Sequence, residues 1–254
     1  MSEVRPRLRM FAGPNGSGKS TLKEALRPEW LGVYINADEI EKAIREDGFL
    51  GLRPYGILPS DAEWRRFLAD STLLKSQGLS DEARYIKIVD DRVVFDSIKV
   101  NSYHASALAG FLRGQLVGHG ISFTFETVMS SSDKVEFLCA ARQAGFRTYL
   151  YYVATEDPEI NVSRVAYRVS QGGHPVSREK IVSRYQRSLD LLPNAVTCAD
   201  RAYVFDNSDS DRVWIAEITD GRELELKADL VPYWFKKALL DRFLGDSGTA
   251  QQVE

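Results

Sequence analysis

The chain has 254 residues, 44% of them hydrophobic, which is enough for one substantial core with at most a smaller appended lobe. Its 33 lysines and arginines nearly balance its 36 aspartates and glutamates, and the net charge of −3 disfavours a long nucleic-acid partner. No stretch approaches the roughly 18 uninterrupted apolar residues of a membrane-spanning helix, so we expect no membrane partner.

Cysteine usage and the N-terminus predict the compartment. Cys139 and Cys198 are the only cysteines, and each lies in a segment expected to be packed helix or a helix end. This placement favours reduced thiols over a disulfide framework. Residues 1–9 contain no apolar run of signal-peptide length, so no targeting segment is expected. These features together predict a cytoplasmic protein.

Five apolar segments are predicted to be β-strands, and helical patterns separate them. These segments are 8–12, 31–36, 121–126, 147–154 and 201–207. Strands that alternate with helices indicate a mainly parallel sheet covered on both faces, because parallel neighbours need crossover connections. The predicted fold class is therefore α/β.

The alternation is interrupted between about residues 50 and 98. Glycines and prolines punctuate a loop there, and two strand-like runs then flank Asp90 and Asp91. We therefore expect a small hairpin-bearing insertion within a single domain that covers residues 1–244.

The C-terminal part is predicted to contain another hairpin. Strand-like arms within residues 213–226 flank the pair Asp220-Gly221, a dipeptide that favours tight turns. Residues 245–254 have the composition of a disordered tail.

A phosphate-binding loop follows the first strand. The segment GPNGSGKS at residues 13–20 satisfies the pattern G-x-x-x-x-G-K-[ST] between an apolar strand and a helix start. Glycines let successive N–H groups converge on phosphate oxygens, and the helix N-terminus adds partial positive charge. The pattern predicts ATP and Mg²⁺ as cofactors. The predicted nucleotide-binding residues are Gly13, Pro14, Asn15, Gly16, Ser17, Gly18, Lys19, Ser20 and Thr21.

Three of these side chains have separate expected roles. Lys19 is expected to reach the β- and γ-phosphates as a positive charge, and the Ser20 hydroxyl to ligate Mg²⁺. Thr21 is expected to support the start of the helix. The motif alone does not distinguish a kinase from a motor or a switch protein.

Two acidic residues follow predicted strands and are candidates for the chemistry. Asp38 lies just past the second strand, where a carboxylate can accept a proton from an acceptor hydroxyl. The structural alternative is that Asp38 or Asn36 caps the next helix. Glu126 ends the third strand and, with Thr127, is a candidate to contact substrate; Glu126 could also hold Mg²⁺ through water, or simply be a helix-capping or core-edge acid.

An arginine-rich segment spans about residues 164–188 and is predicted to be a lid. Arginines on a mobile helix-loop-helix can neutralise the charge of a transferred phosphoryl group and exclude water. The alternative is a solvated basic helix face. The hinge is expected at Gly172-Gly173, and the arginines are Arg164, Arg168, Arg178, Arg184 and Arg187.

Several of these segments together resemble the zeta toxin family of P-loop kinases, in its chromosomal branch. The resemblance rests on AGPNGSGKSTL, INADEI, SFTFETVMS, RVSQGGHPVSREKIVSRYQRSL and YVFDNS. It implies a five-stranded sheet in the order 2-3-1-4-5. It also implies ATP-dependent phosphorylation of a sugar hydroxyl on UDP-N-acetylglucosamine, and a small antitoxin protein as partner.

The resemblance also implies residue roles. Lys19 takes the place of the phosphate-binding lysine, Asp38 that of the catalytic base, and Glu126 with Thr127 that of a substrate or metal contact. One lid arginine of the family matches Arg168 or Arg164, and Arg184 is the candidate for the second. This gives Asp38, Lys19, Arg168 and Arg184 as catalytic residues, with Arg164 on the substrate.

Two other functions fit the same sequence. A polynucleotide 5′-hydroxyl kinase shares the phosphate loop and an acid after the second strand, but its substrate favours a basic groove. A nucleotide-binding regulator without transfer activity would need Lys19 but not Asp38.

Overall fold

The computed structural model describes residues 5–96 and 98–243 of the chain. These residues belong to two compact units: the chain up to Trp30 together with the chain from Glu126 onward, and Leu31–Phe125. Helix α2 (Pro28–Leu31) and strand β6 (Phe123–Thr127) cross the two boundaries. The single domain expected over 1–244 stays a prediction, and the tail expected over 245–254 lies outside the described residues.

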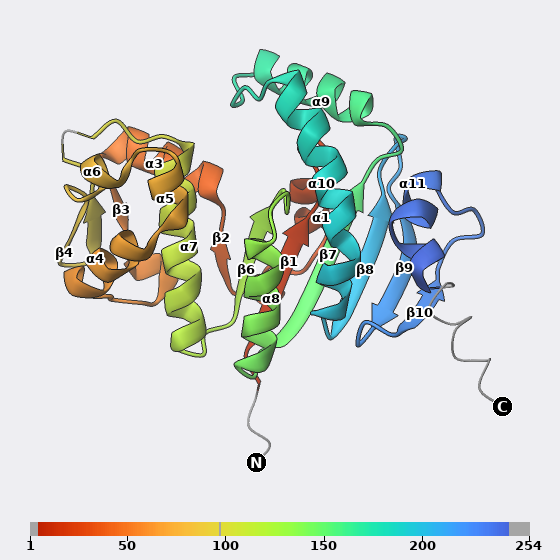
Figure 1. Ribbon diagram of the computed structural model, residues 1–254, viewed down its shortest axis with the longest axis horizontal. Helices are drawn as coiled ribbons and strands as arrows, with labels where there is room; N and C mark the ends of the chain where they lie inside the picture. Colours follow the sequence, from red (N-terminus) through yellow and green to blue (C-terminus); the bar gives the residue numbers. More distant parts are fainter. Residues whose placement is uncertain (1–4, 97, 244–254) are drawn as a thin grey trace. The chain divides into compact units, whose positions relative to one another are not determined.

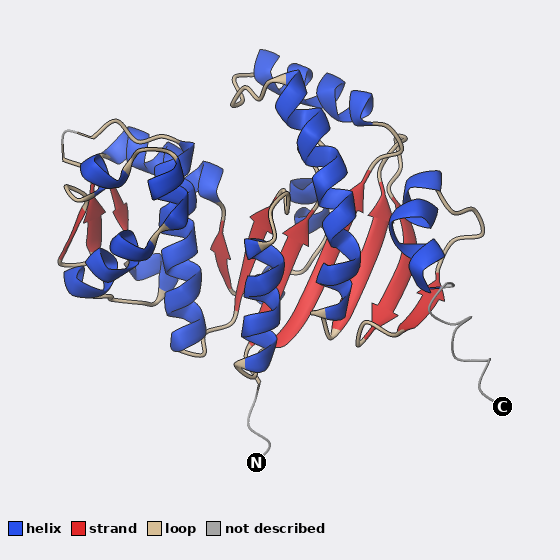
Figure 2. Ribbon diagram, in the orientation of Figure 1, coloured by secondary structure: helices blue, strands red, loops and turns tan. Residues whose placement is uncertain are grey.

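The first unit is built on a sheet in which parallel strands are joined to an antiparallel hairpin. In spatial order the strands are β1 (Arg7–Ala12), β7 (Arg147–Ala154), β8 (Arg201–Asp206), β9 (Val213–Thr219) and β10 (Glu223–Leu226). The first three run parallel, and the last two are antiparallel to their neighbours. Figure 2 shows these strands in red among blue helices.

The hairpin predicted from Asp220-Gly221 is confirmed. Asp220 and Gly221 both have positive φ, 52° and 68°, as a tight hairpin turn requires. The hairpin also extends the sheet beyond β8, a placement that the sequence pattern did not predict.

Helices cover one face of this sheet with a packed core. Alternate side chains of β7 are buried, among them Leu150 and Tyr152, and the Tyr152 hydroxyl lies 3.1 Å from Ser188 Oγ of α10 (Arg178–Thr197). Helices α8 and α10 both pack on β7 (Figure 1). The helices of this unit are α1 (Lys19–Glu24), α8 (Asp133–Gln143), α9 (Pro158–Ser170), α10 (Arg178–Thr197), α11 (Tyr233–Phe235) and the π-helix η2 (Lys236–Leu240).

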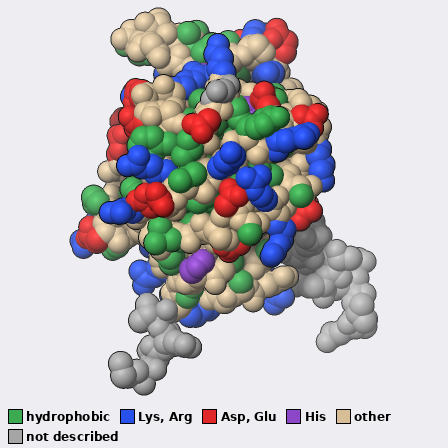
Figure 3. All heavy atoms as spheres, turned by 90° about the vertical axis from the view of Figure 1, so that its left-hand side faces the viewer, with side chains coloured by type: hydrophobic (Ala, Val, Ile, Leu, Met, Phe, Trp, Pro, Cys, Tyr) green, Lys and Arg blue, Asp and Glu red, His purple; other side chains and the backbone are tan. Residues whose placement is uncertain are grey.

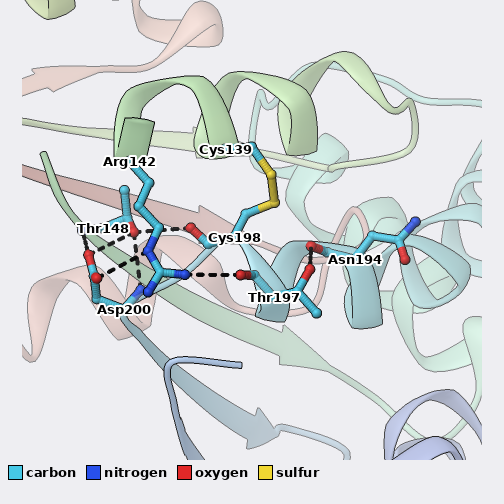
Figure 4. The surroundings of a disulfide bond; sticks show 7 residues. All are labelled: Cys139, Arg142, Thr148, Asn194, Thr197, Cys198 and Asp200. Carbon is cyan, nitrogen blue, oxygen red and sulfur yellow. Dashed lines mark hydrogen bonds and ion pairs between the residues drawn. A yellow bond between two sulfur atoms is a disulfide. The ribbon is translucent and has the colours of Figure 1, made fainter. Parts of the chain in front are cut away.

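The prediction of reduced thiols was wrong. Cys139 of α8 and Cys198, which caps α10, form a disulfide with their Cα atoms 4.7 Å apart (Figure 4). The residues around each cysteine carry no sign of the bond, because packing of α8 against α10 brings the two thiols together. The cysteines therefore do not support the predicted cytoplasmic location.

We expect reduction of this disulfide to lower the free energy of unfolding. It links residues 59 positions apart, and freeing a loop of that length in the unfolded chain costs about 4 kcal/mol of stability. Urea unfolding with and without dithiothreitol measures the difference. A variant with both cysteines changed to serine is the control. Its unfolding midpoint should equal that of the reduced protein and should not change when dithiothreitol is added. Equal midpoints for the oxidised and reduced wild type would contradict the prediction.

The second unit combines a parallel strand pair with the insertion. Strand β2 (Val33–Ile35) pairs in parallel with β6, and β3 (Phe49–Gly51), β5 (Arg92–Val94) and β4 (Lys87–Val89) form a separate antiparallel sheet. The hairpin predicted around Asp90 and Asp91 is confirmed by the pairing of β4 with β5. The other elements are the helices α3 (Ala37–Asp47), η1 (Arg53–Tyr55), α4 (Asp61–Asp70), α5 (Thr72–Ser76), α6 (Ser80–Ala83) and α7 (Ser102–Gly118).

The insertion has its own aromatic core. Trp64 of α4 is 1% exposed, its ring lies 5.1 Å from that of Phe111 in α7, and its indole N–H donates to the Ile86 carbonyl. Burying such a ring with its polar atom satisfied fixes α4 against α7. On the face drawn in Figure 3, basic and acidic side chains are interspersed among hydrophobic ones.

The α/β class with a mainly parallel, helix-flanked sheet is confirmed. Within the first unit β1, β7 and β8 are neighbours in that order, and in the second β6 pairs with β2. The complete order 2-3-1-4-5 stays a prediction. Among the residues that the structure describes, no helix is both long and apolar enough to cross a membrane.

A buried histidine should make the stability of the second unit depend on pH. His104 is 2% exposed, with Nε2 3.0 Å from Glu82 Oε1. Burial lowers the pKa of His104 below its ordinary value, although Glu82 and Glu41 act in the opposite direction. The folded chain then binds fewer protons than the unfolded chain, so stability falls as pH drops from about 6.5 towards the folded pKa.

Urea unfolding of wild type and of His104→Gln checks this pH dependence. The measurements are made at intervals of about one pH unit between about pH 5 and about pH 8. We expect a smaller loss of stability towards low pH in the variant. An equally steep loss in both proteins would show that other groups cause it.

Candidate active site

The phosphate loop lies between β1 and α1, as the sequence predicts. Gly18 caps α1 with φ 98°, and Lys19 is the first residue of the helix. The Lys19 ammonium donates to the carbonyl oxygens of Gly13 and Pro14, each at 2.8 Å. The lysine is thus held over the start of the loop, with its charge at the site predicted for phosphate.

Two glycines of the loop are required by close packing and backbone conformation. Gly13 has φ 138°, and a Cβ there would overlap the carbonyl oxygen of Val153 in β7. A Cβ at Gly18 would overlap the side-chain nitrogen of Asn207. Neither position accepts a side chain, so the motif glycines are explained by the structure around them.

Ser20 and Glu126, two residues that the sequence makes candidates for holding Mg²⁺, contact each other. Ser20 Oγ donates to Glu126 Oε2 at 3.1 Å, although the residues are 106 positions apart. Thr127 is used differently, because its hydroxyl oxygen accepts the N–H of Met129 at 3.0 Å and supports a turn where Met129 has φ 53°. Among the described residues, no group of three or more His, Cys, Asp or Glu could hold a metal ion. The Ser20–Glu126 contact brings one hydroxyl and one carboxylate together beside the loop.

The arginine-rich segment is a helix-loop-helix formed by α9, the connection 171–177 and α10. Arg164 donates to the carbonyl oxygen of Asn207 at 2.6 Å and to those of Ser208 and Asp209 at 3.3 and 3.2 Å. It thereby fastens the loop after β8. Arg168 donates to the carbonyl of His174 at 3.2 Å, within the connection itself.

The arginines of α10 differ in the contacts that their guanidinium groups make. Arg178 forms an ion pair with Glu159, and Arg187 donates to the Ser130 carbonyl at 3.1 Å. Arg184 is half-buried, and its guanidinium makes no hydrogen bond or ion pair with another described residue. Of the arginines in the predicted lid, Arg184 therefore has its guanidinium available for a ligand.

Asp38 belongs to the second unit, in the first turn of α3. Asn36 caps this helix, because its side-chain oxygen accepts the Asp38 N–H at 2.9 Å. Of the two capping residues considered, Asn36 has that role, and the exposed Asp38 carboxylate makes no hydrogen bond or ion pair within the described chain. The cap does not use the carboxylate, which leaves it available for chemistry.

Two asparagines that the sequence did not single out contact the phosphate loop. Asn161 of α9 donates to the carbonyl of Asn15 at 2.6 Å, and Asn207 donates to that of Ser17 at 2.8 Å. Asn207 lies in YVFDNS, one of the segments behind the family resemblance, but no role followed from that pattern. Asn161 carries no sequence signal, because nothing local shows that α9 packs on the loop.

A phosphate loop between β1 and α1, a carboxylate bonded to its serine and an arginine-bearing helix-loop-helix are the parts of a P-loop kinase. A sequence model described as Zeta toxin matches residues 88–219, and the chain belongs to this family. The matched range includes Glu126 and the predicted lid, and it begins after the phosphate loop.

Two solved structures are similar to this chain, and the first of them supports the fold. A structure of the PezAT chromosomal toxin-antitoxin system of Streptococcus pneumoniae is similar over 96% of this chain and 81% of that chain, with 14% identity and a TM-score of 0.51. A chain of the AvrRxo1-ORF1:AvrRxo1-ORF2 complex with sulphate ions aligns over 88% of this chain and 61% of that chain, with 18% identity and a TM-score of 0.49.

Among curated proteins, an uncharacterized protein of Haemophilus influenzae is 31% identical over 65 residues. That match covers 26% of this chain and 46% of the relative, so the chain spans less than half of its length.

Proposed function

We propose that the protein is an ATP- and Mg²⁺-dependent kinase that phosphorylates a hydroxyl group of a small molecule. The observation that supports the proposal is the hydrogen bond between Ser20 of the phosphate loop and the Glu126 carboxylate, two oxygen-bearing side chains of the kind that Mg²⁺ prefers. We propose a nucleotide sugar of the UDP-N-acetylglucosamine type as acceptor, on the family resemblance alone.

The residues of the loop fit a triphosphate. The Ser17 side chain is completely buried, and its Oγ has no hydrogen-bond partner among the described residues, so a phosphate oxygen would satisfy it. Lys19 supplies a positive charge, and α1 presents its N-terminus to the same site. Mg²⁺, when bound, would neutralise charge on the β- and γ-phosphates.

Asp38 is proposed as the general base. The acceptor hydroxyl transfers its proton to the Asp38 carboxylate while its oxygen bonds to the γ-phosphorus, and the bond from that phosphorus to the β–γ bridging oxygen breaks. ADP leaves with the electron pair of that bond. Arg184 and Arg168 are proposed to stabilise the charge on the transferred group, and Arg184 is the better candidate because its guanidinium is not otherwise engaged.

A protein partner is also proposed. The structural relative from Streptococcus pneumoniae belongs to a toxin-antitoxin system. A small antitoxin that binds this chain and blocks nucleotide access is consistent with that likeness and with the family resemblance.

Incubation of the purified protein with γ-labelled ATP and a panel of acceptors tests the proposal. The panel contains UDP-sugars, free sugars and 5′-hydroxyl oligonucleotides, and we expect label on a UDP-sugar. Label on the oligonucleotides would identify a polynucleotide kinase instead. ATP binding without any labelled acceptor would identify a nucleotide-binding regulator.

A further inference from the structure

Asn161 is placed to control one peptide group of the phosphate loop. Its side chain is completely buried, and Nδ2 donates to the carbonyl of Asn15 at 2.6 Å. The buried hydroxyl of Thr155 donates to Asn161 Oδ1. Because the hydroxyl supplies a donor to one end of the carboxamide, the amide nitrogen must face the loop.

Asn207 makes the corresponding contact two residues further along the loop. Its Nδ2 donates to the carbonyl of Ser17 at 2.8 Å. Its own backbone is fixed from both sides, because its N–H donates to Ala154 at 2.9 Å and its carbonyl accepts Arg164 at 2.6 Å. The carboxamide is therefore presented from a rigid segment.

The two contacts determine where the loop N–H groups point. In a planar trans peptide, the C=O of one residue and the N–H of the next point in opposite directions. Holding the carbonyl of Asn15 towards Asn161 turns the N–H of Gly16 away from α9. Holding the carbonyl of Ser17 towards Asn207 turns the N–H of Gly18 away from β8 in the same manner.

We infer that Asn161 and Asn207 are positioning residues that aim the N–H groups of Gly16 and Gly18 at bound phosphate. Donors that are already oriented bind an anion without the cost of ordering the loop. Arg164 acts one step further out, because it fixes the backbone of Asn207. The inference rests on the proposed function only in that the loop binds a triphosphate; it does not depend on the acceptor.

The test measures binding of inorganic triphosphate with Mg²⁺ by calorimetry in Asn161→Asp and Asn207→Asp. Each change keeps the shape but replaces the donor by an oxygen that repels the loop carbonyl. We expect affinity to fall about tenfold to a hundredfold in each variant. Asn194→Asp on the exposed surface of α10 is the matched control, and its affinity should not change.

Protonation provides a readout that a purely structural role would not give. Below the pKa of the new carboxyl group, the protonated acid again carries a donor, so the affinity of Asn161→Asp relative to wild type should recover as pH falls. Should Asn161→Asp fail to fold, Thr155→Val is the second variant. It removes the hydroxyl that orients the amide. We expect several-fold weaker triphosphate binding, roughly the effect of losing one hydrogen bond.

Wild-type affinity in both asparagine variants would overturn the inference. Weaker binding without recovery at low pH would also overturn it, because the loss would then be structural. Triphosphate binding by a wild type that labels no acceptor would refute the proposed kinase activity while leaving this inference supported by the variants.

Discussion

Asp38→Asn is expected to slow phosphoryl transfer by about 10²- to 10⁴-fold and to leave ATP affinity unchanged. The amide cannot take the proton of the acceptor hydroxyl, so the attacking oxygen is no longer activated. Helix α3 should persist, because its cap uses the Asn36 side chain and the backbone N–H of residue 38. Single-turnover transfer from γ-labelled ATP and calorimetric ATP binding measure the two quantities separately.

Glu39→Gln is the matched control for this experiment. Glu39 is the next residue in the same exposed first turn, so the change removes one negative charge at nearly the same place. We expect transfer close to the wild-type rate. Equal losses in both variants would mean that the acidic turn acts by charge alone, and full activity in Asp38→Asn would exclude Asp38 as the base.

Lys19→Met is expected to weaken ATP binding and to reduce transfer by about 10²- to 10³-fold. Methionine has similar length but no charge, so it loses both the attraction for phosphate and the two hydrogen bonds to Gly13 and Pro14. Calorimetry with ATP and with inorganic triphosphate shows whether the loss concerns the phosphates. The two ligands should lose affinity in the same proportion.

Lys23→Met, in the last turn of the same helix, tests whether the loss of any positive charge on α1 is enough to weaken ATP binding. Its affinity for ATP should match wild type. Lys19→Met and Asp38→Asn together separate the functional alternatives. A regulator would need Lys19 and tolerate Asp38→Asn, whereas a kinase needs both residues. Unaltered ATP binding in Lys19→Met would remove the basis of the nucleotide site.

The local features of this chain were predictable because they depend on neighbouring residues. The loop at 13–20 was evident from glycine spacing between an apolar strand and a helix. The turn at Asp220-Gly221 was evident because few residue pairs adopt positive φ at both positions. The Asn36 cap was one of two possibilities, and only the hydrogen bond to the Asp38 N–H distinguished them.

The features that were missed depend on packing between distant segments. The disulfide of Cys139 with Cys198 requires α8 to lie beside α10, and no spacing rule supplies that information. Asn161 is informative only because α9 packs on the phosphate loop, 146 residues away in sequence. The same holds for the hydrogen bonds of Arg164 to three carbonyls of the loop after β8, whereas its predicted contact with substrate stays a prediction.

A crystal structure of the protein with Mg²⁺, a non-hydrolysable ATP analogue and a UDP-sugar tests the proposed role of Asp38 most directly. We expect an Asp38 carboxylate oxygen about 2.6–3.2 Å from the acceptor hydroxyl, with that hydroxyl facing the γ-phosphate. An Asp38 side chain directed away from the nucleotide, with the acceptor hydroxyl contacting another group, would contradict the proposed mechanism.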